Sequence, residues 1–159
     1  MKIWIEGVKE KEQRNRLKEL ANIISPVPVV FVDSLGGSIE RPERGFYYPG
    51  GIANALVVKH GFVVKFLPVF YIAKIGDRFN RPHIKIWNGL SYYSRVGTLL
   101  HETGHALCHK ENCECCRKDR MYREIHANEH ALNWILKYKL NKVLTEEVWF
   151  ILKLSEQNN

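Results

Sequence analysis

The feature that most constrains this chain is the run His101-Glu102-Thr103-Gly104-His105. Residues four positions apart lie on the same face of an α-helix, so the imidazoles of His101 and His105 can bind one metal ion from the same side. Glu102 lies about 100° further round the helix axis, near enough to reach a water molecule on that metal. The run therefore indicates a metal site on one face of a helix.

This spacing is the H-E-x-x-H pattern that is typical of zinc-dependent peptidases. In such sites the zinc makes hydroxide available near neutral pH and polarises a scissile carbonyl, while the glutamate handles the protons. A purely structural zinc site has no need of a base at the position of Glu102. We therefore expect a zinc-dependent endopeptidase in which Glu102 is catalytic and His101 and His105 bind Zn²⁺.

The residues around the run predict an amphipathic helix from about Tyr92 to His109, with Ser91 as a natural N-cap. Its expected buried stripe consists of Tyr93, Val96, Leu100 and Leu107, with Leu99 beside them. Thr98, His101 and His105 share the other face. The apolar side of this helix is therefore available for packing while the metal pair lies elsewhere on its surface.

Two histidines leave a catalytic zinc site short of a ligand, because three protein ligands plus water is the usual arrangement. A second long helix, expected from about Asp119 to Leu140, carries Glu124 and Asn128 on one face. Glu124 can bind the zinc while Asn128 hydrogen-bonds a ligand histidine and fixes its orientation, as in gluzincins. His126 is the rival ligand and points about 200° away from Glu124, so the two are alternatives, of which we expect Glu124. His126 and His130 can also form a separate metal pair, or they have no ligand role.

Four cysteines lie within nine positions of the chain: Cys108, Cys113, Cys115 and Cys116. Their spacing is not the paired C-x-x-C of a zinc ribbon, and His109 lies among them. Three interpretations stay open: a second, structural zinc; a redox-sensitive clasp such as a Cys108–Cys113 disulfide; or reduced thiols in a turn.

The rest of the chain predicts a small, mostly antiparallel or mixed sheet and two outer helices. Strands rich in valine, isoleucine and aromatic residues are expected at residues 29–32, 55–59, 62–67, 69–74 and 83–87. Helices are expected at residues 6–24 and 145–155, the latter with Thr145 as its N-cap, and residues 36–51 predict a loop or irregular hairpin. The expected core of the second long helix is Ile125, Leu132, Trp134, Ile135 and Leu136. The fold class expected is therefore α+β, with the sheet packed on the metal-binding helix and on the glutamate-bearing helix.

Length and composition fit one globular domain over residues 1–159, because 45% of the 159 residues are hydrophobic. The net charge is +7 and the pI is near 9.3, but the basic residues are spread out and no helix-turn-helix or aromatic RNA-binding motif accompanies them. Direct nucleic-acid binding is therefore not favoured. We see no signal peptide or membrane span, and we expect a cytoplasmic protein with reduced thiols.

From about Ile84 to Trp134 the chain resembles the ImmA/IrrE family of zinc metallopeptidases, which are compact gluzincins. A strand at Ile84-Lys85-Ile86 is followed by Leu90-Ser91, by Arg95 and by the run from Thr98 to His109. The family typically has a strand, L-S, an arginine and then T-L-A-H-E-x-G-H-x-x-x-H. The order and spacing of these features are similar.

A second stretch resembles the family signature E-x-E-A-N-x-F-A. Here it reads Glu124-Ile125-His126-Ala127-Asn128-Glu129-His130-Ala131, in which the first glutamate, the first alanine, the asparagine and the last alanine match. His126 replaces the inner glutamate and His130 replaces the phenylalanine. The resemblance implies a minimal zincin-like fold with zinc held by His101, His105 and Glu124.

The resemblance also implies a protease that acts on one protein partner, and members of the family typically cleave a DNA-binding repressor. Two alternatives stay open: a DNA-associated zinc protease of the SprT kind, which would prefer a third histidine and a zinc ribbon, and a non-catalytic zincin-fold binding module. A strand at His83–Trp87, expected at the sheet edge, can pair with an extended substrate. The candidates for a second oxyanion donor are Tyr92, Tyr93, Arg95 and His109.

Overall fold

The computed structural model describes residues 10–32, 35, 44–49, 54–59, 62–68 and 82–157, with the backbone alone for 54–59, 62–68, 115 and 116. The helices are α1 (Glu10–Ile24), α3 (Tyr92–Lys110), the short 3₁₀ turn η1 (Glu114–Arg117), α4 (Arg120–Lys137) and α5 (Val143–Gln157). The strands are β1 (Val29–Val32), β2 (Gly45–Tyr48), β3 (Asn54–Lys59), β4 (Phe62–Pro68) and β5 (His83–Trp87). The α+β class predicted from the sequence is confirmed at this coarse level.

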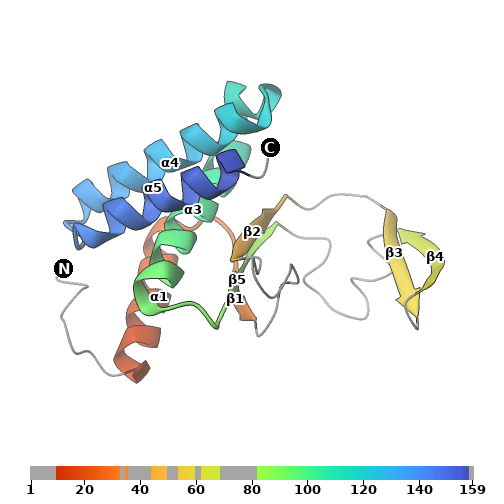
Figure 1. Cartoon of the computed structure of the whole chain (residues 1–159), viewed down its shortest axis with the longest axis horizontal. Coiled ribbons are helices and arrows are strands. Elements are labelled where there is room, and N and C mark those ends of the chain that lie inside the picture. The colour runs from red at the N-terminus through yellow and green to blue at the C-terminus, as the bar shows by residue number, and fades with distance from the viewer. Residues whose placement is uncertain are drawn as a thin grey trace.

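Helix α3 lies at the centre of the fold, between the α4–α5 pair and the sheet (Figure 1). It contacts α1, α4, α5, β2 and β5. The core around it is formed by Leu17, Leu20 and Ile24 of α1, Ile84 and Ile86 of β5, Val96, Leu99, Leu100 and Ala106 of α3, Ala131 and Ile135 of α4, and Leu140, Leu144 and Val148 near and in α5. The predicted metal-binding helix is therefore the element on which the others pack.

The main sheet has three strands in the order β1-β5-β2 and is mixed, as predicted. Strand β1 pairs with β5 in parallel, and β2 pairs with β5 in antiparallel register, with Gly45 opposite Ile86. The expectation that β5 lies at the edge is wrong, because β1 and β2 pair with both of its sides. Within residues 36–51, for which a loop or irregular hairpin was predicted, Gly45–Tyr48 form the strand β2, which pairs with the distant β5.

A separate two-stranded antiparallel sheet is formed by β3 and β4, with a register shift between Val57 and Val58. These strands match those predicted at residues 55–59 and 62–67. The strand predicted at residues 69–74 and the first turn of the helix predicted from residue 6 lie outside the described residues.

Side-chain hydrogen bonds mark where α3, α4 and α5 begin. Ser91 caps α3 by accepting a hydrogen bond from the backbone N–H of Ser94, as predicted. Asp119 caps α4 in the same way, accepting from the N–H of Tyr122 at 2.9 Å. The prediction that Thr145 caps the last helix is wrong, because α5 already begins at Val143, whose N–H donates to the side chain of Asn141 at 3.0 Å.

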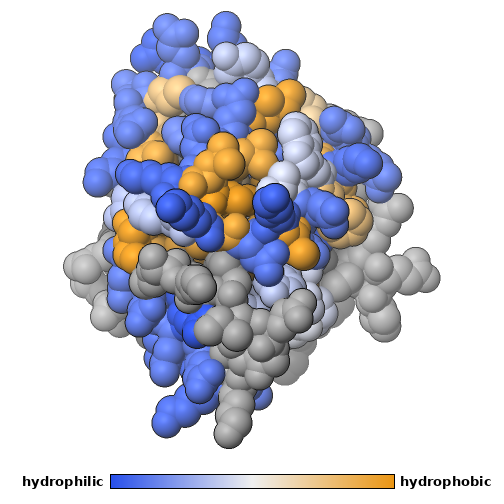
Figure 2. All heavy atoms as spheres, turned by 90° about the vertical axis from the view of Figure 1, so that its left-hand side faces the viewer, coloured by the Kyte–Doolittle hydropathy of each residue, from blue (hydrophilic) through white to orange (hydrophobic). Residues whose placement is uncertain are grey.

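The buried face of α4 is narrower than predicted. Its buried residues are Ala127, Asn128, Ala131 and Ile135, while Ile125 is 44% exposed and Leu136 is 77% exposed. The small alanines allow α3 and α5 to approach closely, so α4 needs little large apolar surface. At the end of the molecule where α4 meets α5, Figure 2 shows hydrophobic atoms exposed among hydrophilic ones. None of the described helices is long and apolar enough to cross a membrane.

Candidate metal centre

Three predicted ligands converge between α3 and α4. Nε2 of His101 lies 2.6 Å from Oε2 of Glu124, and Nε2 of His105 lies 3.3 Å from the same oxygen. The two histidine Nε2 atoms are 3.2 Å apart, with their rings edge to face. His101 is buried, while His105 and Glu124 are partly open to solvent at 20% and 15% side-chain exposure. A regular helix accounts for the histidine pair, and the antiparallel packing of α4 brings in the carboxylate.

These distances fit the donor set of a zinc ion. Nitrogen and oxygen ligands about 2.0–2.1 Å from a tetrahedral zinc lie about 3.3 Å from one another. The His101–His105 and His105–Glu124 separations are close to that value, and only the 2.6 Å separation of His101 and Glu124 is shorter. The three groups are therefore able to hold one metal ion with small side-chain adjustments.

Asn128 orients the buried histidine. Its Oδ1 lies 3.3 Å from Nδ1 of His101, and Asn128 is itself 2% exposed. An amide oxygen only accepts hydrogen bonds, so Nδ1 of His101 donates to Asn128, and Nε2 is the nitrogen that faces Glu124 and His105. Nε2 donates to the Glu124 carboxylate in the metal-free protein and can bind a metal once it is deprotonated. The predicted hydrogen bond between Asn128 and one of the two predicted ligand histidines is confirmed, with His101 as the partner.

The three groups also shift one another's ionisation. Burial opposes a charge on His101, but the hydrogen bond to Glu124 and the charges of Glu102 and Glu124 outweigh it and raise the pKa of His101. Burial likewise opposes a charge on Glu124, but its hydrogen bonds to His101 and His105 hold the pKa of this carboxyl far below its usual range. Glu124 is therefore an anion across the physiological pH range and available as a ligand.

The glycine of the motif sets the distance between the two helices. A Cβ atom added at Gly104 would lie 2.4 Å from the carbonyl oxygen of Ala127 and 2.9 Å from its Cα. Only glycine allows the α4 backbone to pass this closely over α3, although glycine costs about 1 kcal/mol relative to alanine inside a helix. The close approach at Gly104 thereby brings Glu124, one turn before Ala127, within reach of the histidines.

Glu102 lies on the side of α3 that faces β2. A Cβ atom at Gly45, the first residue of β2, would lie 2.6 Å from Cγ2 of Thr98 and 3.6 Å from Cγ of Glu102. The strand therefore passes directly along the helix beside the predicted catalytic carboxylate, which is partly exposed to solvent. Sequence analysis missed β2, although the aromatic pair Tyr47-Tyr48 is a weak strand signal.

The four predicted oxyanion donors have other contacts. Arg95 donates to Asn88 at 3.3 Å, and the hydroxyl of Tyr93 accepts from Asn141 at 3.2 Å. Tyr92 stacks at an angle on Tyr93, at the opposite end of α3 from the cysteines. His109 continues the i, i+4 series of His101 and His105, and its Nδ1 lies 2.9 Å from the Tyr47 hydroxyl of β2. The contact of His109 with Tyr47 joins α3 to β2.

The C-terminal helix also reaches the site. The hydroxyl of Ser155 in α5 lies 3.4 Å from Oε2 of Glu124 and also donates to the carbonyl of Ile151 at 3.2 Å. At the other end of α5, Glu147 accepts from Ser94 of α3 at 3.2 Å. Helix α5 therefore runs along α3 and places a polar side chain behind the predicted ligand.

The rival ligand, His126, lies in a different cluster. Its Nδ1 is 3.4 Å from Sγ of Cys108 and 3.3 Å from Sγ of Cys113. Neither cysteine is in a disulfide. Two separate triads therefore lie between α3 and α4, one of His101, His105 and Glu124, the other of Cys108, Cys113 and His126. Sequence analysis grouped His109 with the cysteines and did not connect His126 to them.

Searches for relatives give no support for a family assignment. No protein-family model, no curated protein and no solved structure matches the chain. The chemistry of this centre is therefore argued from its own residues.

Proposed function

We propose that this protein is a zinc-dependent endopeptidase with a zincin-like fold of the gluzincin type, similar to the ImmA/IrrE family. Its substrate is a protein, and a DNA-binding repressor is the first class to test. The observation that carries the proposal is the convergence of His101, His105 and Glu124 on one point, with Glu102 on the next position of the same helix.

His101, His105 and Glu124 are the residues that would hold the metal. When bound, a divalent ion supplies Lewis acidity, which polarises a peptide carbonyl and makes a water molecule easier to deprotonate. Asn128 holds the ring of His101 in the tautomer that a ligand needs. Ser155 contributes a hydroxyl near Glu124, which helps to hold that carboxylate in place.

Glu102 is the general base in this proposal. It is partly exposed and lies between the two histidines along α3, next to β2 rather than next to α4. Its carboxylate accepts a proton from the attacking water and delivers it to the amine of the leaving peptide.

Strand β2 is the part of the sheet that suits substrate binding. It pairs with β5 on one side, and no described strand pairs with its other side. An extended peptide that added to this edge would lie beside Gly45 and Glu102. Strand β2 takes over the role that sequence analysis gave to β5.

The placement of His126 weighs against the SprT-like alternative. That reading prefers a third histidine at the metal, whereas the described third partner of His101 and His105 is Glu124. Experiment distinguishes the non-catalytic alternative, because a binding module would function normally when Glu102 is replaced by Gln.

The test compares the wild-type protein with Glu102→Gln on a proteome-derived mixture of folded proteins that contains DNA-binding repressors. New N-termini are identified by mass spectrometry after incubation with zinc-loaded protein. We expect defined cleavages with wild type and none with Glu102→Gln, although both proteins bind the same amount of zinc. Equal cleavage by the two proteins, or no cleavage by either, would overturn the proposal.

A further inference from the structure

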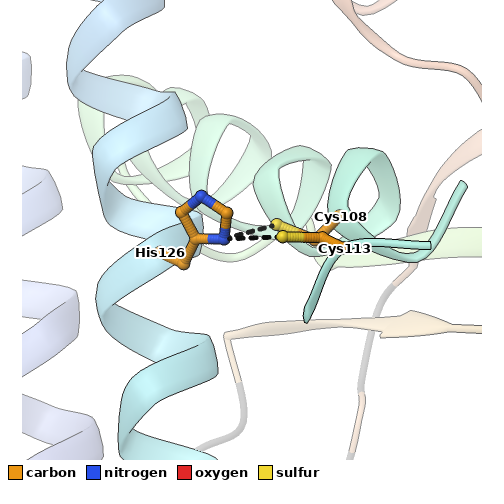
Figure 3. A group of neighbouring side chains, drawn as sticks. All are labelled: Cys108, Cys113 and His126. Carbon is orange, nitrogen blue, oxygen red and sulfur yellow. Dashed lines mark hydrogen bonds between the residues drawn. The ribbon is translucent and has the colours of Figure 1, made fainter. Parts of the chain in front are cut away.

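The cluster of Cys108, Cys113 and His126 lies outside the proposed peptidase centre. Figure 3 shows both sulfur atoms pointing toward the Nδ1 edge of the imidazole. Cys108 is 2% exposed, and Cys113 and His126 are half-buried. The cluster is therefore a partly enclosed group of two thiols and one imidazole, all of which can bind a metal ion.

The end of α3 brings the two cysteines together. The N–H of Cys113 donates to the carbonyl of Cys108 at 2.9 Å, and the N–H of Asn112 donates to the carbonyl of His109 at 3.1 Å. Asn112 has a φ of 51°, so these bonds form a Schellman motif with Asn112 at its left-handed position. This motif brings its third-last helical residue against the residue that follows the turn, and here both are cysteines.

The end of α4 has the same Schellman motif with its usual apolar side-chain contact. There Leu140 donates to the carbonyl of Ile135 at 2.9 Å around Lys139, whose φ is 50°. The paired side chains are Ile135 and Leu140, both buried, as expected for the hydrophobic contact that accompanies the motif. At the end of α3 two thiols replace this apolar pair and face an imidazole from another helix.

We propose that Cys108, Cys113 and His126 form a second metal site, which binds Zn²⁺ and has a structural role. A tetrahedral zinc with sulfur at about 2.3 Å and nitrogen at about 2.0 Å separates these ligand atoms by about 3.5 Å. The observed sulfur–nitrogen distances of 3.4 Å and 3.3 Å are close to this. Binding releases the two thiol protons, and the two thiolates neutralise the charge of the ion.

The site joins the end of α3 to α4. Its ligand from α4, His126, is two residues after Glu124, so a metal here also fixes the segment that carries the peptidase ligand. A metal held by two cysteines and a histidine that join two helices stabilises the packing of those helices.

The experiment isolates the second site by removing the first. Full-length wild type and Glu124→Ala are prepared under reducing conditions, stripped of metal and dialysed against a small excess of free Zn²⁺. We expect wild type to bind two zinc ions per chain and Glu124→Ala to bind one. Adding Cys113→Ser or His126→Ala to Glu124→Ala removes that ion, whereas adding His130→Ala, a histidine one turn further along α4, retains it. Circular dichroism verifies that each variant is folded.

Titration with Co²⁺ identifies the ligands independently of activity. The Glu124→Ala protein shows a near-ultraviolet thiolate-to-cobalt charge-transfer band, which Cys113→Ser weakens or abolishes. The proposal is overturned if reduced Glu124→Ala binds cobalt without this band, or if it binds no cobalt at all. It is also overturned if the Cys113→Ser and His126→Ala double variants keep their zinc. Because the band reports only on thiolates, these outcomes are independent of whether the protein is a peptidase.

Discussion

The two triads between α3 and α4 use the same pair of helices in different ways. His101 and His105 meet because a regular helix places residues four apart on one face, whereas Cys108 and Cys113 meet because the chain reverses at the helix end. Helix α4 contributes one residue to each triad, Glu124 to the first and His126 to the second. A divalent ion would keep a charge of +1 among two imidazoles and a carboxylate, but it would be neutral with two thiolates. The first site thus suits catalysis and the second suits a structural clamp.

The largest expected effect is the loss of peptide hydrolysis in Glu102→Gln, a substitution that leaves metal binding intact. Glu102→Gln removes the proposed general base, so we expect the rate of peptide hydrolysis to fall by about 10²–10⁴-fold. Both metal sites keep their zinc, because Glu102 belongs to neither triad. His130→Ala is the control and retains the wild-type rate. A Glu102→Gln protein that kept the wild-type rate would contradict the proposal that Glu102 is the general base.

A change at Gly104 affects both triads together. Gly104→Ala sets a methyl group 2.4 Å from the Ala127 carbonyl oxygen, so the helices must separate. We expect the free energy of unfolding of the metal-free protein to fall by about 2 kcal/mol, in spite of the better helix propensity of alanine. We expect zinc affinity to fall at both sites, because Glu124 and His126 lie on α4 just before Ala127.

Gly97→Ala is the matched control in the same helix. Its new methyl group would meet Cβ of Glu147 in α5 at 3.0 Å, a milder overlap than at Gly104. We expect a smaller loss of stability by chemical denaturation and unchanged zinc stoichiometry. A Gly104→Ala protein as stable as wild type would contradict the close approach of α3 and α4.

The next prediction affects the histidine site alone. Asn128→Ala removes the hydrogen-bond acceptor that holds the ring of His101, and we expect zinc affinity at this site to fall by about 10–100-fold. The cysteine site is unchanged, because Asn128 does not contact it in the described structure. Competition with a zinc chelator measures both affinities, and equal weakening at the two sites would contradict the assignment.

The smallest effect is a pH dependence in the metal-free protein. The raised pKa of His101 contributes stability that is present below its ordinary pKa of 6.5 and is lost as the pH rises through the folded-state pKa. The lowered pKa of Glu124 contributes stability that is present above 4.5 and is lost as the pH falls through its folded-state pKa. Wild type therefore exceeds Glu124→Gln in stability by about 1 kcal/mol between pH 4.5 and 6.5, and the difference shrinks at higher pH.

Nuclear magnetic resonance of the imidazoles tests the same pair directly. Glu124→Gln lowers the pKa of His101, because the hydrogen bond to a carboxylate and its charge are lost. A His101 pKa that does not change in this variant would contradict the contact between the two side chains.

Features set by local geometry were predictable from the sequence. Helix periodicity located α3 and α4 to within a few residues, and Ser91 marked the start of α3 through its side-chain oxygen. The four-residue spacing of His101 and His105 fixed their common face, and the Glu124–Asn128 spacing gave both the carboxylate and the hydrogen bond to His101.

Features that depend on distant partners were not predictable in this way. Strand β2 exists because β5 pairs with it, and β5 is central because β1 joins it from the other side. Leu136 follows a buried isoleucine, but the narrow contact of α4 leaves it exposed. His109 was grouped with the cysteines by sequence proximity, yet adjacent helical residues point about 100° apart, and His126 approaches Cys108 through the packing of α4.

The most direct test is a crystal structure of the zinc-loaded full-length protein with anomalous data collected at the zinc edge. The account predicts one peak bounded by Nε2 of His101, Nε2 of His105 and the Glu124 carboxylate, and a second bounded by the cluster of Cys108, Cys113 and His126. No peak between His101, His105 and Glu124, or a peak there that His126 ligates in place of Glu124, would contradict it.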